Sequence, residues 1–123
     1  MSKRTYVPER GDVIHVNLGG TAGREFDGPH FALVISHGEF QRKTGLCVVL
    51  PTTSKNHPEL AALAVKLPPL AGLNPDGWVL IHRVRTVDFR ERGAERAAQL
   101  QPDDPRHQQY LGDLIDRLFG IVD

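Results

Sequence analysis

The side chains best suited to acid–base and phosphate chemistry lie on both sides of an apolar segment of this chain. A glycine-rich loop before that segment carries Arg24, Glu25 and His30, and Thr53 and Ser54 follow the next apolar stretch. An imidazole changes charge near neutral pH and can act as an acid or a base. A guanidinium can bind phosphate through two parallel hydrogen bonds. These polar groups are therefore competent to handle a nucleic acid.

Short strands must position these residues. Residues 12–18 alternate well enough to predict a half-buried strand. Residues 31–36 form a continuous apolar run, which is typical of a strand buried on both faces. Residues 46–50 predict a second buried strand, and we expect Pro51 to end it. The polar stretch 37–44 between the two predicts one helical turn or a loop.

The second half of the chain predicts further strands and one helix. Residues 60–67 fit an edge strand, and a turn-rich connection follows it. Residues 78–81 predict a strand that 84–89 continues or pairs with. Asp103-Asp104-Pro105 is a helix-start signal, because acidic caps precede a proline at the first helical position. The apolar residues beyond it recur with helical spacing and give one amphipathic face: Tyr110, Leu111, Leu114, Ile115, Leu118 and Phe119.

This order of elements indicates a fold class. Short strands followed by a terminal helix predict a mainly β fold with a C-terminal helix, namely a small barrel capped by that helix. A chain of 123 residues fits one domain with a modest core. No internal repeat or long linker divides the sequence. We therefore expect a single domain over residues 1–123.

Composition narrows the class of protein. The hydrophobic content of 40% and the charged content of 24% are ordinary for a soluble globular protein. The net charge is zero, which argues against a passive DNA coat or a membrane-surface binder, although residues 83–96 are locally rich in arginine. No apolar run approaches the ~20 residues of a membrane span. The N-terminus lacks the apolar region of a secretory signal. We expect a cytoplasmic protein.

Cysteine and histidine usage favours structural roles over metal binding. The lone Cys47 lies in an apolar run, so a buried structural thiol is expected. His37, His57 and His107 show no ligand spacing with a cysteine or a carboxylate pair, so a zinc site is not expected. The sequence thus indicates neither a metal nor another cofactor.

Several short motifs resemble, in their order and spacing, the MazF/PemK/Kid family of bacterial toxins. The resemblance covers roughly residues 6–122. It rests on Tyr6-Val7-Pro8-Glu9-Arg10-Gly11-Asp12, Gly23-Arg24-Glu25 with Gly28, the stretch 40–45 with Pro51-Thr52-Thr53-Ser54, and Gly77-Trp78-Val79-Leu80 followed by Val84-Arg85-Thr86-Val87-Asp88. Each motif is weak by itself, and their common order makes the match specific.

The resemblance implies a fold, an activity and partners. Members are SH3-like small barrels of the MazF/PemK/CcdB type that act as homodimers. They are toxins of type II toxin–antitoxin systems, and they cut single-stranded RNA at short sequences without a metal. Attack by the 2′-hydroxyl leaves a 2′,3′-cyclic phosphate. A cognate antitoxin protein covers the RNA groove and silences the enzyme.

The resemblance also implies catalytic residues. Thr53 fits the family's catalytic threonine, and the alternative is that it only caps a strand end. The family's catalytic arginine is replaced by His30 here. Our hypothesis is that His30 takes over proton transfer while Arg24 stabilises the charge of the phosphorane. The alternative is that His30 merely starts the buried strand and that the nuclease is weak.

Six further residues are expected to bind the RNA: Glu25, Phe26, Ser54, Lys55, His82 and Arg83. Phe26 could stack on a base or meet the antitoxin, whereas Trp78 fits a core position better. His82 and Arg83 stand where several relatives have Asp-Gln, which makes this wall more positive, unless both side chains face solvent. His15 fits a partly buried core or interface position.

A non-enzymatic toxin of the same fold is the alternative function. Gyrase poisons of the CcdB type rely on C-terminal residues, commonly Trp-Gly-Ile. This chain ends Phe119-Gly120-Ile121-Val122-Asp123, which matches that ending only faintly. A catalytically impaired binding member is the other form of this alternative. Pro51-Thr52-Thr53-Ser54 favours the nuclease.

Overall fold

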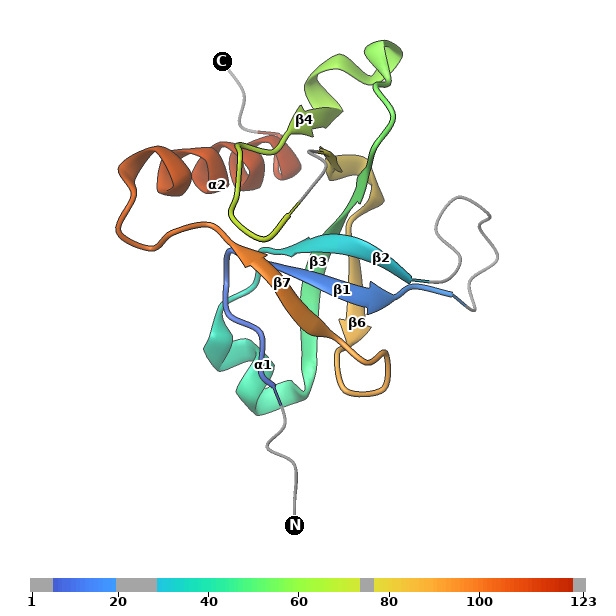
Figure 1. The fold of residues 1–123 in the computed structure, drawn as a ribbon, viewed down its shortest axis with the longest axis vertical. Coiled ribbons are helices and arrows are strands. Elements are labelled where there is room, and N and C mark those ends of the chain that lie inside the picture. The colour runs from blue at the N-terminus through green and yellow to red at the C-terminus, as the bar shows by residue number, and fades with distance from the viewer. Residues whose placement is uncertain (1–5, 20–28, 74–76, 121–123) are drawn as a thin grey trace.

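Antiparallel strands make up most of the protein (Figure 1). The computed structural model describes residues 6–19, 29–73 and 77–120. Within those ranges the strands are β1 (Asp12–Asn17), β2 (Pro29–Val34), β3 (Leu46–Thr53), β4 (Ala64–Lys66), β5 (Trp78–Leu80), β6 (Arg85–Asp88) and β7 (Glu95–Gln99). No helix of the described ranges is long and apolar enough to cross a bilayer.

Strand β3 is the central element of the sheet. The strand order is β4-β5-β3-β2-β1-β7, and β6 also pairs with β3. The first half of β3 pairs with β6, its middle with β2, and its last two residues, Thr52 and Thr53, with β5. The mainly β fold with a C-terminal helix, predicted from the sequence, is confirmed. Over the described residues the sheet does not close into the predicted barrel, since β4 and β7 end the strand order.

Two α-helices lie on different sides of the strands, α1 (Gly38–Thr44) and α2 (Pro105–Leu118) (Figure 1). The side chain of His37 caps α1 by accepting from the Glu39 amide at 3.0 Å. Gly45 ends α1 in the left-handed region, at φ 75°. The predicted start of α2 is confirmed, because Asp104 accepts from the amide of Arg106 at 2.9 Å. Two short 3₁₀ segments, η1 (Pro58–Leu63) and η2 (Ile81–Arg83), complete the structure.

The sheet separates two apolar cores. Leu33 packs in the first core with residues of β3, β5 and α2, including Leu111 and Leu114. Ala32 and Val34, which point to the other face of β2, pack in the second core with residues of β1, β3 and β6. This alternation follows from the two-residue period of a strand. Residues 32–34 are therefore buried on both faces of β2, as predicted for this part of the strand.

Several boundaries differ from the sequence prediction. Pro51 does not end β3: it pairs with Ala32 where β3 leaves β2 for β5, and a proline fits such an irregular position. Within 60–67, the residues 60–63 belong to η1, and only the three residues of β4 make the expected edge strand. β6 pairs with β3 instead of the strand at 78–81.

The sequence prediction also lacked one strand and placed one residue of the C-terminal helix wrongly. β7 pairs with β1 in a register that joins Asp12 to Gln99, and the sequence analysis did not predict it. The residues of β7, Glu-Arg-Ala-Ala-Gln, show no hydrophobic pattern typical of a strand. The strand β7 therefore depends on its pairing with β1. Phe119, expected on the apolar face of α2, is 74% exposed because the helix ends at Leu118.

Cys47 has the predicted structural role. Its side chain is 0% exposed in the second core. Burial raises the pKa of its thiol to about 12. The thiol therefore stays protonated at neutral pH and is not a nucleophile.

Candidate nucleic-acid cleft

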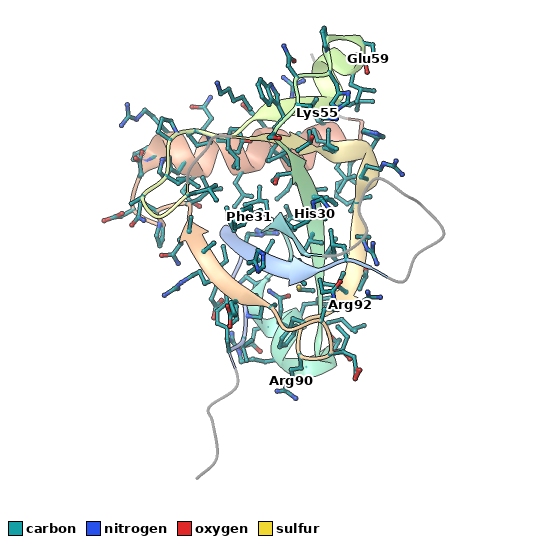
Figure 2. The ribbon with its side chains drawn as sticks, turned by 45° about the vertical axis from the view of Figure 1, so that its right-hand side comes forward. His30, Phe31, Lys55, Glu59, Arg90 and Arg92 are labelled. Atoms are coloured by element: carbon teal, nitrogen blue, oxygen red, sulfur yellow. The ribbon has the colours of Figure 1, made fainter. Side chains whose placement is uncertain are left out.

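A cleft of about 740 Å³ opens where β2 begins and β3 ends. Its walls come from β1, β2, the end of β3, η1 and η2. Figure 2 shows His30 and Phe31 in the middle of the molecule, with Lys55 and Glu59 above them. Arg90 and Arg92 lie at the opposite end, outside this cleft.

The cleft brings together most of the residues that the sequence singled out. His30 stands at the start of β2, and Thr53 stands at the end of β3. The other predicted residues that line it are Ser54, Lys55, His82 and Arg83. Three predicted residues, Arg24, Glu25 and Phe26, lie outside the residues that the structure describes. Segments distant in the sequence thus converge on one concave surface.

Two threonines end β3 in different ways. Thr52 is 8% exposed, and its hydroxyl donates to the carbonyl of Phe31 at 3.1 Å, which ties β3 to β2. The hydroxyl oxygen of Thr53 accepts from the amide of Lys55 at 3.2 Å. Thr53 therefore caps the strand end, which was the alternative considered from the sequence, and it also lines the cleft. A hydroxyl that accepts a hydrogen bond keeps its own O–H as a donor.

Gly77 has a steric role behind these threonines. A Cβ atom at Gly77 would lie 3.1 Å from the carbonyl oxygen of Thr53 and 3.7 Å from the Cβ of Thr52. The missing side chain lets β5 approach the end of β3 closely. The carbonyl of Gly77 also accepts from the amide of Leu67 at 2.9 Å, which connects this wall to β4.

The segment η2 presents the basic wall of the cleft. Ile81 is 1% exposed and anchors η2 in the first core. The amide of Val84 donates to the carbonyl of Ile81 at 3.3 Å and closes the turn. His82 is exposed and Arg83 is half-buried, and both line the cleft. The expected groove position of this pair thus agrees with its placement.

The other arginines of the region 83–96 act elsewhere. The guanidinium of Arg85 donates to the carbonyl of Leu18 at 3.3 Å. The guanidinium of Arg92 donates to the carbonyls of Asn17, at 3.5 Å, and Gly19. Burial and then the charge of Arg92 lower the pKa of Arg85. Arg85 and Arg92 therefore bind the backbone at the end of β1 and in the two residues that follow it.

Sequence reasoning gave no cleft position to several residues that line it, among them His15, Phe31 and Glu59. His15 was expected at a partly buried position and is exposed. Its place between Ile14 and Val16 was a usable signal, since a polar residue between two apolar ones faces outward on a strand. Phe31 gave no signal, because it belongs to an apolar run.

His57 and Glu59 form an ion pair at the rim of the cleft. The Nδ1 atom of His57 lies 3.1 Å from a carboxylate oxygen of Glu59. The backbone amide of Glu59 and then the side chain of His57 lower the pKa of the Glu59 carboxyl. The described part of the cleft therefore combines four imidazoles and two permanent cations with one carboxylate. No group of three or more His, Cys, Asp or Glu side chains in the described part of the chain could hold a metal ion.

Trp78 lies outside the cleft and is not a full core residue. It is half-buried on β5. The ammonium of Lys66 on β4 lies 5.1 Å from the centre of its ring, a cation–π distance. The expected core position is thus reached only in part.

The fold and the cleft define a class of protein, and comparison with known families identifies it. The family described as the PemK-like, MazF-like toxin of type II toxin–antitoxin systems matches residues 9–107. The chain belongs to this family. The resemblance drawn from the sequence motifs is thereby confirmed.

Curated relatives lie within the same family. The chain is 34% identical over 101 residues to the endoribonuclease toxin MazF of Escherichia coli K12, a match that covers 80% of this chain and 85% of that protein. It is 38% identical over 115 residues to the endoribonuclease PemK of Escherichia coli, covering 93% of this chain and 81% of that protein. The endoribonuclease class expected from the sequence agrees with both names.

Solved structures share the fold. MazF from Deinococcus radiodurans superposes with a TM-score of 0.72 at 31% identity, covering 94% of this chain and 99% of that one. A MazE–MazF structure from the same organism gives a TM-score of 0.71 at 31% identity, covering 95% and 100%. A mycobacterial endoribonuclease in complex with its cognate antitoxin gives 0.69 at 19% identity, covering 97% and 99%, which shows the fold alone.

Proposed function

We propose that this endoribonuclease toxin binds single-stranded RNA in the cleft and cuts it there without a metal ion. The observation that carries the proposal is the convergence of His30, Thr53 and the basic wall on one concave surface. An imidazole supplies proton transfer, a hydroxyl supplies a hydrogen bond to phosphate, and Lys55 and Arg83 supply positive charge for the RNA backbone.

The proposed reaction moves one proton through His30. Its imidazole accepts the proton of the 2′-hydroxyl while the bond from the 2′-oxygen to phosphorus forms. The bond from phosphorus to the 5′-oxygen then breaks, and the imidazolium returns the proton to that oxygen. The products are a 2′,3′-cyclic phosphate and a free 5′-hydroxyl. The hydroxyl of Thr53 donates to a phosphoryl oxygen as charge develops, and we assign the same charge stabilisation to Arg24.

Cleavage of a long single-stranded RNA in EDTA tests this proposal. We expect cuts at one short motif, with 2′,3′-cyclic phosphate ends. Proton transfer by a positioned side chain contributes about 10²–10⁴-fold, so His30→Ala is expected to slow cleavage by at least about 100-fold. Thr53→Ser keeps the hydroxyl and is expected to retain activity that Thr53→Ala loses. Lys43→Ala, on α1, is the control and is expected to cleave normally.

Two results would contradict parts of the proposal. Full cleavage by His30→Ala would remove the histidine from proton transfer. No cleavage of any RNA, from folded protein free of its antitoxin, would favour a toxin that binds a target without cutting it.

We also propose two partners and a cellular location. Relatives solved as MazE–MazF structures support a cognate antitoxin protein for this chain. A homodimer and a cytoplasmic location fit the family. Light scattering of the purified protein measures its mass and tests the dimer. Co-purification with the product of a short acidic reading frame directly upstream tests the antitoxin.

A further inference from the structure

A row of three side chains crosses the floor of the cleft, and the proposed reaction leaves it without a role. His15 on β1 pairs with Phe31 on β2. Thr52 on β3 directly follows Pro51, the last residue of β3 that pairs with β2. All three members of the row line the cleft. The hydrogen bond from the Thr52 hydroxyl to the Phe31 carbonyl fixes the row at 3.1 Å.

Two members of this row are aromatic rings in contact. The ring centres of His15 and Phe31 lie 5.3 Å apart, and their planes meet at 62°, an edge-to-face arrangement. Cross-strand partners of this kind share one face of a sheet. Phe31 packs against the first core with part of its ring and lines the cleft with another part. His15 stands beside it and is exposed.

The exposure of this ring pair contrasts with the apolar residues beside it on the two strands. Ile14 and Val16, on either side of His15, are 0% and 1% exposed. Ala32 and Leu33, which follow Phe31, are both 0% exposed. The aromatic pair is therefore the place where β1 and β2 leave apolar surface open to the cleft.

Such a surface suits a nucleobase. Proteins recognise single-stranded RNA by splaying its bases and stacking them on aromatic side chains. The rings stand on paired strands and not on a loop, so they are ordered before RNA arrives and lose little entropy on binding. The hydroxyls of Thr53 and Ser54 and the cations of Lys55 and Arg83 line the same cleft and suit the RNA backbone.

We propose that His15 and Phe31 form a stacking subsite for one nucleobase of the RNA substrate. Thr52, the third member of the row, is followed directly by Thr53, so this base belongs to a nucleotide next to the cleaved phosphate. The subsite rests on the proposed RNA cleavage in this cleft. It makes the ring pair a determinant of binding and of sequence preference, separate from the groups that move protons.

Binding of a series of short RNAs with single abasic nucleotides tests the subsite. Each RNA carries the cleavage motif with a 2′-deoxy nucleotide at the cut, which removes the nucleophile, and each lacks the base at one position. Stacking of one base contributes about 1–3 kcal/mol. We therefore expect one abasic position to weaken binding to the wild-type protein by about tenfold or more. In His15→Ala the same position is expected to cost almost nothing.

Two further variants separate stacking from other roles of the ring pair. His15→Phe keeps an aromatic face and is expected to keep the penalty at that abasic position. Phe31→Leu keeps core volume and is expected to reduce the penalty, with circular dichroism checking the fold. Phe119→Ala removes an aromatic ring that is 74% exposed at the end of α2, and it is expected to bind every RNA as the wild type does.

The outcomes distinguish the subsite from the nuclease itself. An abasic profile that is the same in wild type and His15→Ala would overturn the subsite while leaving RNA cleavage intact. Loss of the penalty in His15→Phe as well would show that the imidazole does not act by stacking, and it would also overturn the proposal. A wild-type protein that cuts no RNA would contradict the proposed function and the subsite together.

Discussion

Two regions of the molecule, the end of the sheet near α1 and the cleft, both place polar side chains next to an apolar core. The two regions differ in the burial and the hydrogen bonding of those side chains. Asp12, near α1, is 0% exposed. Its carboxylate accepts from the hydroxyl of Tyr6, from the amide of Glu9 at 3.0 Å and from the side chain of Gln99 at 3.3 Å. Burial and then the hydrogen bond to Asp12 raise the pKa of Tyr6. Three donors therefore satisfy one buried carboxylate.

Gln41 on α1 repeats this pattern. It is 1% exposed, and its amide nitrogen donates to the carbonyls of Pro8, at 3.1 Å, and Ser36, at 2.9 Å. Its amide oxygen accepts from the hydroxyl of Ser36 at 2.8 Å. That hydroxyl in turn accepts from the amide of Val48 at 2.8 Å. Together these bonds connect α1 to Pro8 and, through Ser36, to β3.

The polar groups of the cleft are placed instead for contact with a ligand. His15, Ser54, Lys55 and His82 are all exposed while lining a concave surface. An unmade hydrogen bond costs most where water cannot replace it. Removing a polar group near α1 is therefore expected to reduce stability, whereas removing one in the cleft is expected to reduce activity or binding.

The largest expected effect on stability is that of Asp12→Ala. The substitution leaves the hydroxyl of Tyr6 and the amide of Glu9 without their buried acceptor, and unsatisfied buried groups cost about 1–3 kcal/mol each. We expect the free energy of unfolding to fall by about 3 kcal/mol, measured by urea denaturation. Asp113→Ala removes an exposed carboxylate on α2 and is the matched control, expected to change stability little.

The Asp12→Ala variant also tests whether the polar groups near α1 serve stability and not activity. The folded fraction of Asp12→Ala is expected to cleave RNA at the wild-type rate, because the described hydrogen-bond partners of its carboxylate, Tyr6, Glu9 and Gln99, lie outside the cleft. A protein with wild-type stability, or one that is folded but inactive, would contradict the division between the two regions.

Gly77→Ala is expected to have an intermediate effect and to reduce both stability and cleavage. The added Cβ would lie 3.1 Å from the carbonyl oxygen of Thr53, so the end of β3 must shift by a few tenths of an ångström. We expect a loss of about 1 kcal/mol in stability and about a tenfold loss in cleavage rate, because small displacements of reacting groups are costly.

Gly112→Ala is the matched control for this glycine. Its Cβ would meet nothing within 4 Å on α2, so the substitution is expected to raise stability by about 0.5–1 kcal/mol through helix propensity. Equal effects of the two substitutions on stability and on cleavage would contradict the steric role of Gly77.

Glu59→Gln is expected to have the smallest effect on stability. The pKa of the Glu59 carboxyl is lowered from its ordinary value of 4.5. Its contribution is therefore present above about pH 4.5 and is lost as the pH falls through the lowered pKa. The side chain is exposed, so the melting temperatures of wild type and variant are expected to differ little at pH 7 and to coincide at pH 3.

Binding of RNA is expected to respond more clearly to this variant. Removing the carboxylate at the rim makes the cleft more positive, so we expect affinity at pH 7 to rise by about threefold at low salt and the gain to shrink at high salt. An unchanged affinity at low salt would place the RNA backbone away from Glu59.

The sequence predicted the elements whose signals are local. The alternation around Val13 and Val16, the apolar run before Ile35, and the cap and proline at Asp104 and Pro105 each report the structure of their own segment. The pattern Pro51-Thr52-Thr53-Ser54 placed hydroxyls correctly at the end of a strand. These features depend on backbone conformation and burial, which neighbouring residues determine.

The features that were missed depend on distant segments. β7 exists because β1 offers it a partner, and the continuation of β3 past Pro51 depends on β5. The ring of Phe31 reaches the cleft because β2 begins there, which its apolar neighbours could not indicate. Glu59 lines the cleft because of the position of η1. One sequence carries no record of such tertiary contacts, and residue types alone therefore left this part of the cleft unassigned.

The pairing of β1 with β7 has a consequence for the synthesis of this protein. Strand β1 is made early, yet its partner ends at Gln99, and α2 supplies Leu111 and Leu114 to the first core only afterwards. Domains begin to fold during synthesis, but a sheet that pairs β1 with β7 must wait for its last strand. The first core is therefore closed only after β7 and α2 have been made, so the sheet that carries the cleft gains its full packing late in folding.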